Sequence, residues 1–297
     1  MNALKRPIVS ITSAFYNTGP YMLDMIRSVF AQTFTDWELV LLDDGSTDNS
    51  LQIAKSINDS RVKVFTNERN LGIPASLNRL TILSNGKYIA RMDSDDISAI
   101  NRIQRQLEFM EANPNIDVLG CGLIYLGQKD IPLGHRFAPV THEQICKSPT
   151  RSYEMAHPTI MAKKTWFQKY KYNESISRSS DYELFLRTHN LSKYTNIPQP
   201  LFYYRLVTHF NIKKLANHRH CNAKFIFDYH MQRKCLCMGM IDSLLPYLKL
   251  AIDISTYSLM GKEKLLSRRY EHIDEIKKES YIQELEYIKN IKLPLKS

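Results

Sequence analysis

The strongest constraint on the fold is a regular alternation of strand-like and helix-like segments in the first third of the chain. Four short apolar runs read as strands, at residues 8–13, 37–42, 62–65 and 88–92. The segments between them, 21–32, 49–57 and 75–83, carry apolar residues with helical spacing. Strands separated by helices tend to pair in parallel, so we expect an α/β fold with a mainly parallel central sheet flanked by helices.

A polar loop follows each of these strands, at 14–17, 43–46, 67–70 and 93–96. The carboxyl ends of parallel strands meet at one edge of a sheet, and ligands of such folds bind there. The four loops should therefore line one cleft.

Three aspartates crowd into the fourth loop, Asp93, Asp95 and Asp96. Mg²⁺ and Mn²⁺ prefer carboxylate, water and phosphate oxygens, so a D-x-D at a strand end can hold such a cation and a diphosphate. We expect Asp93 to face a sugar or ribose hydroxyl and Asp95 to face the metal. Asp96 would do either, or cap the following helix. An isolated Asp-rich turn is most often a surface loop, but this position after a strand favours the metal site.

The second loop, 43–48, is also acidic, and Gly45 permits a tight turn in it. Asp44 is placed to accept a hydrogen bond from the N3–H of a uracil base. Ser46 or Asp48 could cap the next helix, and the two roles are compatible. Arg69, near the end of the third strand, could reach a phosphate or face solvent.

The remaining pattern predicts a helix at 101–113, a strand at 117–126, a hairpin and loop to about residue 149, a helix at 181–187 and a strand at 201–205. Beyond residue 209 the pattern is helical and basic. We therefore expect a catalytic domain over residues 1–210 and a basic helical region over 211–297, packed on it as an appendage.

The net charge of +10 suits nucleic acid, an anionic membrane or phosphorylated substrates. The stretch from 211 to 297 carries sixteen Lys and Arg against ten Asp and Glu, so much of the excess is C-terminal. That region would bind a membrane surface or pack on the body or on a second subunit. The N-terminus lacks the apolar core of a signal peptide, and no uninterrupted apolar run is long enough to span a membrane, so we expect a cytoplasmic protein.

Five scattered cysteines without a Cys-x-x-Cys fit a reducing compartment. A group of histidines and cysteines in the C-terminal region has spacings unlike common structural zinc motifs, which favours ordinary packing or surface roles. Its members are His218, His220, Cys221, His230, Cys235 and Cys237.

Taken in order, these motifs resemble glycosyltransferase family 2, whose members use nucleotide-sugars and have the GT-A fold. The resemblance covers about the first 210 residues and rests on segments 9–17, 28–34, 37–48, 70–72, 86–96, 157–158, 180–187 and 204–205.

The resemblance implies a role for several residues. The nucleotide would be lined by Ala14, by Phe15 through backbone and ring, and by the adjacent Tyr16. Asp44 would contact uracil, and Asp93 and Asp95 would form the D-x-D with Asp95 on Mn²⁺ or Mg²⁺.

The family's general base belongs to a Glu-Asp pair before a helix. Here the pair reads Ser180-Asp181, so Asp181 takes the base position, unless it serves only as a helix cap. Arg205 and His209 would lie near the diphosphate, with His209 completing the metal coordination.

The expected activity is an inverting, metal-dependent transfer of a sugar from a UDP-hexose or UDP-N-acetylhexosamine to a glycan or glycolipid acceptor of a cell-surface polysaccharide or lipopolysaccharide. One alternative is a sugar-nucleotide nucleotidyltransferase, but the loop at 14–19 lacks the glycine- and lysine-rich composition of a triphosphate site. Another is a non-catalytic basic protein that binds membranes or nucleic acid. The expected enzyme uses no nucleic acid, lies in the cytoplasm or on the inner face of the membrane, and could form homo-oligomers.

Overall fold

The computed structural model describes residues 6–206 and 211–296. Its centre is a nine-stranded sheet with the strand order β3-β2-β1-β4-β8-β6-β9-β5, and β7 pairs with β6. The first four strands along the chain are β1 (Val9–Phe15), β2 (Trp37–Asp43), β3 (Val62–Thr66) and β4 (Tyr88–Arg91). They pair in parallel, as predicted.

Beyond β4 the sheet becomes mixed. β8 (Met161–Lys163) joins β4 antiparallel, and β6 (Val118–Leu126) continues the sheet from β8. β6 pairs in parallel with the long β9 (Tyr194–Arg205) and antiparallel with β7 (Pro132–Arg136), which confirms the predicted hairpin. The short β5 (Ile97–Ser98) pairs antiparallel with β9 at the edge of the sheet. It directly follows residues 93–96, which we call the acidic loop. The parallel part is thus restricted to β1–β4 and the β6–β9 pair.

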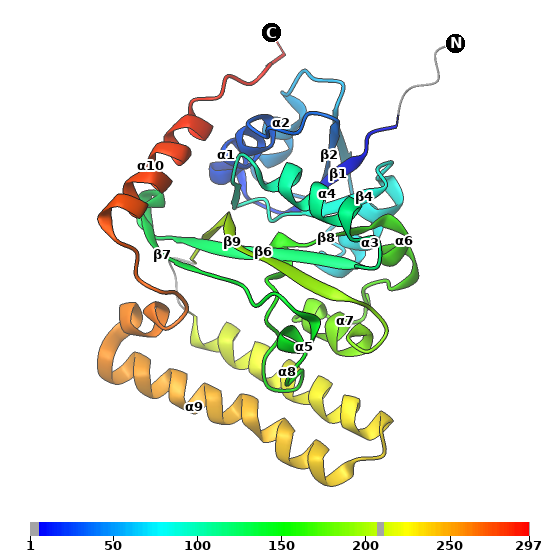
Figure 1. Cartoon of the computed structure of the whole chain (residues 1–297), viewed down its shortest axis with the longest axis vertical. Helices are drawn as coiled ribbons and strands as arrows, with labels where there is room; N and C mark the ends of the chain where they lie inside the picture. Colours follow the sequence, from blue (N-terminus) through cyan, green and yellow to red (C-terminus); the bar gives the residue numbers. More distant parts are fainter. Residues whose placement is uncertain (1–5, 207–210, 297) are drawn as a thin grey trace.

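Helices cover both faces of the sheet (Figure 1). They are α1 (Gly19–Phe30), α2 (Ser50–Lys55), α3 (Ile73–Leu83), α4 (Arg102–Ala112), α5 (His142–Ile145), α6 (Lys164–Lys169) and α7 (Ser180–Thr188), with short 3₁₀ turns η1 (Gln128–Asp130) and η2 (His157–Thr159). All seven residues of β2 are buried, because both faces of a parallel strand are packed against helices.

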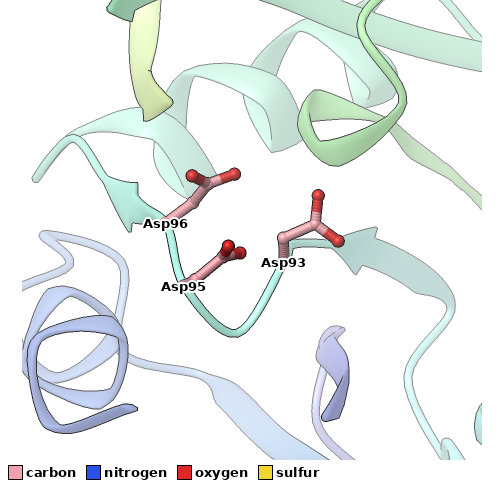
Figure 2. Close-up of side chains that lie close together, drawn as sticks. All are labelled: Asp93, Asp95 and Asp96. Carbon is pink, nitrogen blue, oxygen red and sulfur yellow. The ribbon is translucent and has the colours of Figure 1, made fainter. Parts of the chain in front are cut away.

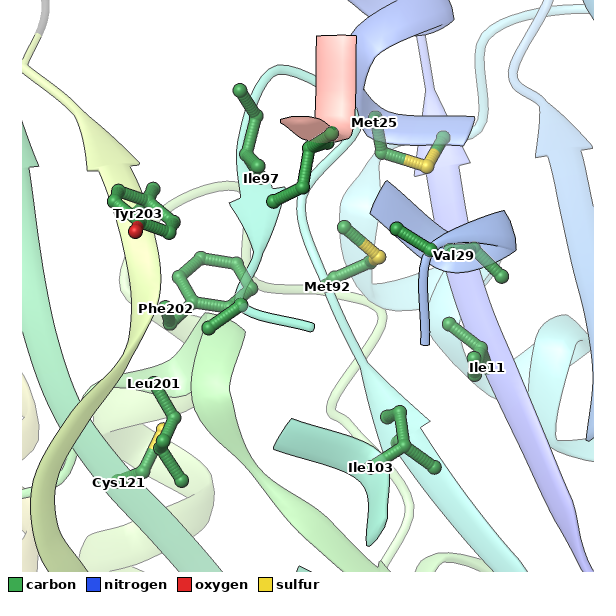
Figure 3. Close-up of a cluster of buried hydrophobic side chains, with 14 of the residues drawn as sticks. Ile11, Met25, Val29, Met92, Ile97, Ile103, Cys121, Leu201, Phe202 and Tyr203 are labelled. Carbon is green, nitrogen blue, oxygen red and sulfur yellow. The ribbon is translucent and has the colours of Figure 1, made fainter. Parts of the chain in front are cut away.

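Two apolar clusters form the core, one on each face of the sheet. In α1 the buried residues Met22, Met25, Ile26 and Val29 recur with helical spacing and form one stripe against the sheet. Figure 3 shows how Met25 and Val29 of that helix meet residues of the strands and of the acidic-loop region, such as Ile11, Met92 and Phe202.

Three helices follow β9: α8 (Ile212–Gln232), α9 (Leu236–Ser267) and α10 (Glu275–Lys289). α8 and α9 pack on each other below the sheet, and α9 is interrupted near its end by Gly261, whose φ is 81°. Within the described residues, no helix is both long enough and apolar enough to cross a bilayer.

α10 returns to the body of the molecule (Figure 1). Tyr281, Leu285 and Ile288 are buried in the same core cluster as α1, and Glu284 accepts a hydrogen bond from the backbone N–H of Ile100 at 2.9 Å. The predicted division at residue 210 remains a prediction, but the last helix of the expected appendage contributes to the core of the catalytic part.

Candidate active site

The loop after β2 organises the expected nucleotide end of the cleft. Asp44 is 2% exposed and its Oδ1 accepts hydrogen bonds from Asn67 Nδ2 at 2.7 Å and from the backbone N–H of Leu71 at 2.9 Å. Among the described residues, its Oδ2 accepts one hydrogen bond, from the backbone N–H of Gly72 at 2.9 Å. Asp44 therefore ties the loops after β2 and β3 together. The expected contact with uracil stays a prediction, and Oδ2 has the acceptor capacity for it.

Gly45 has a φ of +79°, and a Cβ built on it would lie 3.0 Å from the backbone carbon of Arg69. The two loops approach so closely that only glycine fits. Arg69 itself is exposed, and its expected contact with a phosphate stays a prediction.

The residues after β1 do not all face the cleft as expected. The ring of Phe15 is 1% exposed and packs in the core, so the predicted ring contact with the nucleotide is wrong for this residue, although its backbone remains at the strand end. The physical reason is strand alternation, which turns Phe15 to the α1 side and Ala14 to the other face. Tyr16, at 44% exposed, is the accessible ring of this loop.

Asp93, Asp95 and Asp96 converge at the end of β4, with one carboxylate oxygen of each within 4.8 Å of the others (Figure 2). Burial and the neighbouring charge of Asp93 raise the pKa of Asp95, and burial together with the other two charges raises the pKa of Asp96. Like charges held this close favour a cation between them. Asp96 Oδ2 is buried without a hydrogen-bond partner among the described residues, which is the kind of oxygen that a metal satisfies. The three residues fit a divalent cation.

Asp96 does not cap the following helix. It precedes β5, and the N-cap of α4 is Asn101. Instead, Asp96 Oδ1 accepts a hydrogen bond from the backbone N–H of Arg205 at 2.8 Å, while Oδ2 has no hydrogen-bond partner among the described residues. The alternative in which Asp96 joins the metal ligands is the one that the geometry favours.

Arg205 lies behind the acidic loop. Its guanidinium donates to Asp130, to Asp24 and to the backbone oxygen of Asp95, and its side chain is 8% exposed. These contacts take up its donors, so the expected direct contact with the donor diphosphate is replaced by a contact that positions the acidic loop. His209, the other residue expected near the diphosphate, lies outside the described residues.

Arg91 is a site residue that the sequence reasoning missed. It ends β4, and its side chain pairs with Asp93, Nη1 to Oδ2 at 3.1 Å. Burial alone would lower the pKa of Arg91, but nearby charges, among them those of Asp93 and Asp181, outweigh burial and raise it. The guanidinium of Arg91 therefore interacts with both carboxylates. A charged residue inside an otherwise apolar strand next to an acidic motif was the available signal.

Asp181 lies in the first turn of α7, after Ser180. It is not the cap of its helix, because the N-cap position belongs to Ser179, which has a φ of 56°. Burial raises the pKa of Asp181, which makes its carboxylate a stronger base than an exposed aspartate. This position is consistent with the expectation that Asp181 is more than a helix cap. Its role as a base remains a proposal.

A cavity of about 910 Å³ contains both Asp93 and Asp181 in its lining. His157 also lines it, with Nε2 2.7 Å from the hydroxyl of Tyr172. Burial, then the charge of Arg91, lowers the pKa of His157 well below its ordinary value, so the ring is neutral at physiological pH. The cavity therefore brings together Asp93 of the acidic loop, the partly buried carboxylate of Asp181 and a neutral histidine that can bond to hydroxyl groups.

The histidines and cysteines of the C-terminal region are dispersed. His218 is bonded to Ser179, His220 to Tyr247 and His230 to Asp242, and the cysteines are free thiols. Within residues 6–206 and 211–296, the three aspartates form the one group whose ligand atoms gather around a common point. The expected ordinary packing roles fit these contacts.

Comparison with known proteins agrees with this geometry. The model of the family described as "Glycosyl transferase family 2" matches residues 10–175. An uncharacterized glycosyltransferase of Methanocaldococcus jannaschii is 30% identical over 238 residues, which are 78% of this chain and 82% of that protein.

Two solved structures share the fold. TarS of S. aureus in complex with UDP-GlcNAc superposes with a TM-score of 0.60 at 19% identity, covering 86% of this chain and 76% of that one. A mannosyltransferase of Pyrobaculum calidifontis in complex with GDP-Man and Mn²⁺ gives a TM-score of 0.60 at 12% identity, covering 96% and 86%. They confirm the predicted GT-A-type fold. With the family model matching more than half of its length, this chain belongs to glycosyltransferase family 2.

Proposed function

We propose that this glycosyltransferase transfers a hexose or N-acetylhexosamine from a UDP-sugar to a hydroxyl of a cell-surface glycan, such as a capsule or a lipopolysaccharide, with inversion at the anomeric carbon. The observation that supports the proposal is that Asp93 and Asp181 line one cavity, so a donor at the acidic loop and an acceptor at Asp181 would share it. The UDP-GlcNAc complex of TarS supports the choice of donor.

The carboxylates of Asp93, Asp95 and Asp96 would hold Mn²⁺ or Mg²⁺ at the donor diphosphate. When bound, the cation neutralises charge on the departing diphosphate. The Mn²⁺ complex of the P. calidifontis enzyme supports this assignment. Arg91 would limit the negative charge of the corner through its ion pair with Asp93.

In the proposed reaction, Asp181 takes the proton of the acceptor hydroxyl as the oxygen attacks the anomeric carbon, and the bond from that carbon to the diphosphate oxygen breaks on the opposite face. Because the attacking and leaving oxygens lie on opposite faces of the anomeric carbon, the configuration of that carbon is inverted. The neutral His157 would bond to a sugar hydroxyl without adding charge.

The direct test is a panel of nucleotide-sugars with the full chain, measuring thermal stabilisation and slow donor hydrolysis with and without Mn²⁺. We expect UDP-hexoses or UDP-N-acetylhexosamines to stabilise and to be hydrolysed, with loss of both effects in EDTA. Binding of nucleoside triphosphates with pyrophosphate release would favour a nucleotidyltransferase instead. Absence of any nucleotide binding would contradict the proposal and favour a non-catalytic basic protein.

We also propose that α9 attaches the enzyme peripherally to the inner face of an anionic membrane. Several large apolar side chains of this helix are more than half exposed, among them Ile241 at 64% and Leu244 and Leu248 at 59% each. Ile241, Leu244, Leu248 and Ile252 recur at helical spacing on one face of α9, and the chain carries a net charge of +10. An apolar face on a basic protein fits an interface between acyl chains and anionic headgroups.

The test substitutes Leu244→Ser and Leu248→Ser together and measures pelleting with vesicles that contain anionic lipid. Truncation after residue 210 is unsuitable, because it would also remove the buried residues of α10. We expect the double variant to lose most of its vesicle binding, while Leu191→Ser, an exposed leucine outside α9, keeps it. Concentration-dependent dimerisation without vesicle binding would assign the face to a second subunit.

A further inference from the structure

Most of the charged side chains that line the cavity beside Asp181 are cations. Seven Arg and Lys side chains line it against two carboxylates, those of Asp93 and Asp181. The cations come from segments far apart in the sequence, from β4 and β7, the turn before α7, the two helices α8 and α9, and the end of α9. They are Arg91, Arg136, Arg178, Arg219, Lys249, Arg268 and Arg269.

Only part of this charge is neutralised inside the protein. Arg91 pairs with Asp93, and Arg219 pairs with Asp253 at 2.7 Å, whereas Arg136 lies 4.0 Å from Glu154. The other four cations, among the residues that the structure describes, have no carboxylate within 4.0 Å. Lys249 donates to the backbone oxygen of Arg151, and Arg268 donates to Thr256 Oγ1 at 3.3 Å, and both contacts leave the charge uncompensated.

The pKa shifts of two groups beside the cavity also reflect nearby positive charge. Burial lowers the pKa of Lys249, and the charge of Arg219 lowers it further, against the opposing charges of Glu154 and Asp253. Burial and the charge of Arg178 lower the pKa of His218. Arg219 Nε is also buried without a partner. These cations repel one another in a partly desolvated space, which an anion would relieve.

Three of these cations, Arg136, Arg219 and Lys249, also line a second cavity, whereas Arg268 and Arg269 line only the first. The second cavity, of about 440 Å³, adjoins the first and shares Asp181, Arg136, Arg219 and Lys249 with it. This cavity is also lined by Arg151 and Glu154, but by none of the three aspartates of the acidic loop. A donor diphosphate bound at the acidic loop would therefore not occupy it.

Resting on the proposed transfer, we propose that the acceptor is anionic and that Arg219, Lys249, Arg268 and Arg269 bind its phosphate or carboxylate group while Asp181 faces its reacting hydroxyl. Guanidinium groups suit both kinds of anion, because their N–H groups can bond to two oxygens at once. The anion would come either from the diphosphate of a lipid-linked sugar or from the carboxylate of a uronic acid unit. Both have the same recognition chemistry.

The test measures binding of three probes to the full chain saturated with UDP and Mn²⁺. The probes are decyl galactoside, which is neutral, decyl galacturonide, and galactosyl decyl diphosphate. We expect at least one anionic probe to bind about tenfold or more tightly than the neutral one at low salt, with the difference shrinking as salt rises. The tighter of the two anionic probes identifies the source of the anion.

The double variant Arg268→Gln/Arg269→Gln and the single variant Lys249→Gln should each lose about fivefold or more of the affinity for the anionic probe, with little change for the neutral one. Lys264→Gln is the matched control, because it removes one exposed charge from α9 at a position that lines neither cavity. Its affinities should match those of the unsubstituted chain.

Equal affinity for the three probes overturns the inference, as does an equal loss in Lys264→Gln or the absence of binding by every probe while UDP still binds. Donor hydrolysis without acceptor is measured in parallel. If the donor is hydrolysed but the anionic probes bind no more tightly than the neutral one, only the acceptor assignment is contradicted. If the chain neither binds UDP nor hydrolyses the donor, the proposed transfer itself is contradicted.

Discussion

Arg205 and Asp130 form a two-bond ion pair behind the acidic loop, with Nε to Oδ1 at 2.6 Å and Nη2 to Oδ2 at 2.7 Å. Lys289 of α10 contacts the same Asp130 Oδ2 at 2.5 Å. Nη1 of Arg205 donates to the backbone oxygen of Asp95 at 2.6 Å. The side chains of Lys289, Asp130 and Arg205 thereby connect α10 to the loop that carries the expected metal ligands.

Replacing Arg205 by lysine should therefore weaken both the fold and the metal site. Lysine keeps the charge but cannot form the two-bond pair, and the pair is buried, so we expect a loss of about 1–3 kcal/mol in the free energy of unfolding. Urea unfolding measures that loss, and Mn²⁺ titration should show weaker binding. Lys87→Gln, which breaks the exposed pair with Glu111, should cost less than about 1 kcal/mol and leave Mn²⁺ binding unchanged. Equal costs for the two variants would contradict the role of Arg205.

Asp181→Asn should lower kcat by roughly 10²–10⁴ with UDP binding retained, because the variant loses the proton acceptor but keeps its shape. Activity should rise as the pH increases through the raised pKa of Asp181, since the base acts in its deprotonated form, and this limb should disappear in the variant. Steady-state kinetics over a pH series measure both. Glu183→Gln, on the same helix, should keep its turnover, and unchanged turnover in Asp181→Asn would remove the residue from the mechanism.

Asp95→Asn and Asp96→Asn should each abolish most of the stabilisation by Mn²⁺. A ligand at a hundred times its Kd stabilises a fold by about 2.7 kcal/mol, and neutralising a ligand carboxylate raises the Kd. Thermal unfolding with Mn²⁺ and with EDTA gives the difference for each chain. Glu111→Gln, on the surface, serves as the control. A full Mn²⁺ effect in both variants would show that the cation binds elsewhere.

Gly45→Ala should destabilise the protein by about 1–3 kcal/mol and weaken UDP binding, because it strains the backbone and pushes a Cβ against the chain at Arg69. Gly261→Ala is a matched control: its φ is +81°, close to the +79° of Gly45, but its Cβ would meet nothing within 4 Å. It should show the backbone strain without a change in UDP affinity. Calorimetric titration with UDP separates the two, and an equal loss of affinity would contradict the loop contact.

Glu38→Gln should destabilise the protein at neutral pH but not in acid. Glu38 is 2% exposed; burial alone would raise its pKa, but hydrogen bonds from Lys63, Ser10 and Asn85 outweigh burial and hold the pKa below its ordinary value of 4.5. Its stabilisation is complete above the unfolded-state pKa and is lost as the pH falls through the folded-state pKa. We expect a cost of about 1–3 kcal/mol at pH 7 that fades below pH 4.5. Denaturant unfolding at both pH values tests this, with Glu108→Gln expected to stay within about 0.5 kcal/mol throughout.

Local patterns were sufficient for the elements near the nucleotide end. The predicted strand at 37–42 is β2, which begins at Trp37 and ends at Asp43, and the other three strands of the first third agree to within a few residues. Apolar runs and helical spacing report directly on burial, so they locate such elements well. Alternation does not report which strand joins which, and the antiparallel entry of β8 beside β4 could not be read from the sequence.

The same distinction applies to the residues of the site, because local motifs identified some of them and contacts between distant segments decided the others. Asp93 and Asp95 were identifiable because their motif follows a strand directly, and the structure brings them together with Asp96. Phe15 and Arg205 were assigned to the donor, but side-chain orientation and distant partners turn one into the core and the other behind the loop. Arg91 was overlooked because its position in β4 made it look like part of a buried strand.

The sequence by itself determined the type of fold, the family and the acidic loop, because periodicity and short motifs depend on neighbours along the chain. The tertiary structure alone decided that α10 returns to the core and that Lys249 and Arg269 converge on the cavity of Asp181. Those contacts join residues far apart in the sequence, and their formation depends on how helices pack. No local pattern encodes that packing.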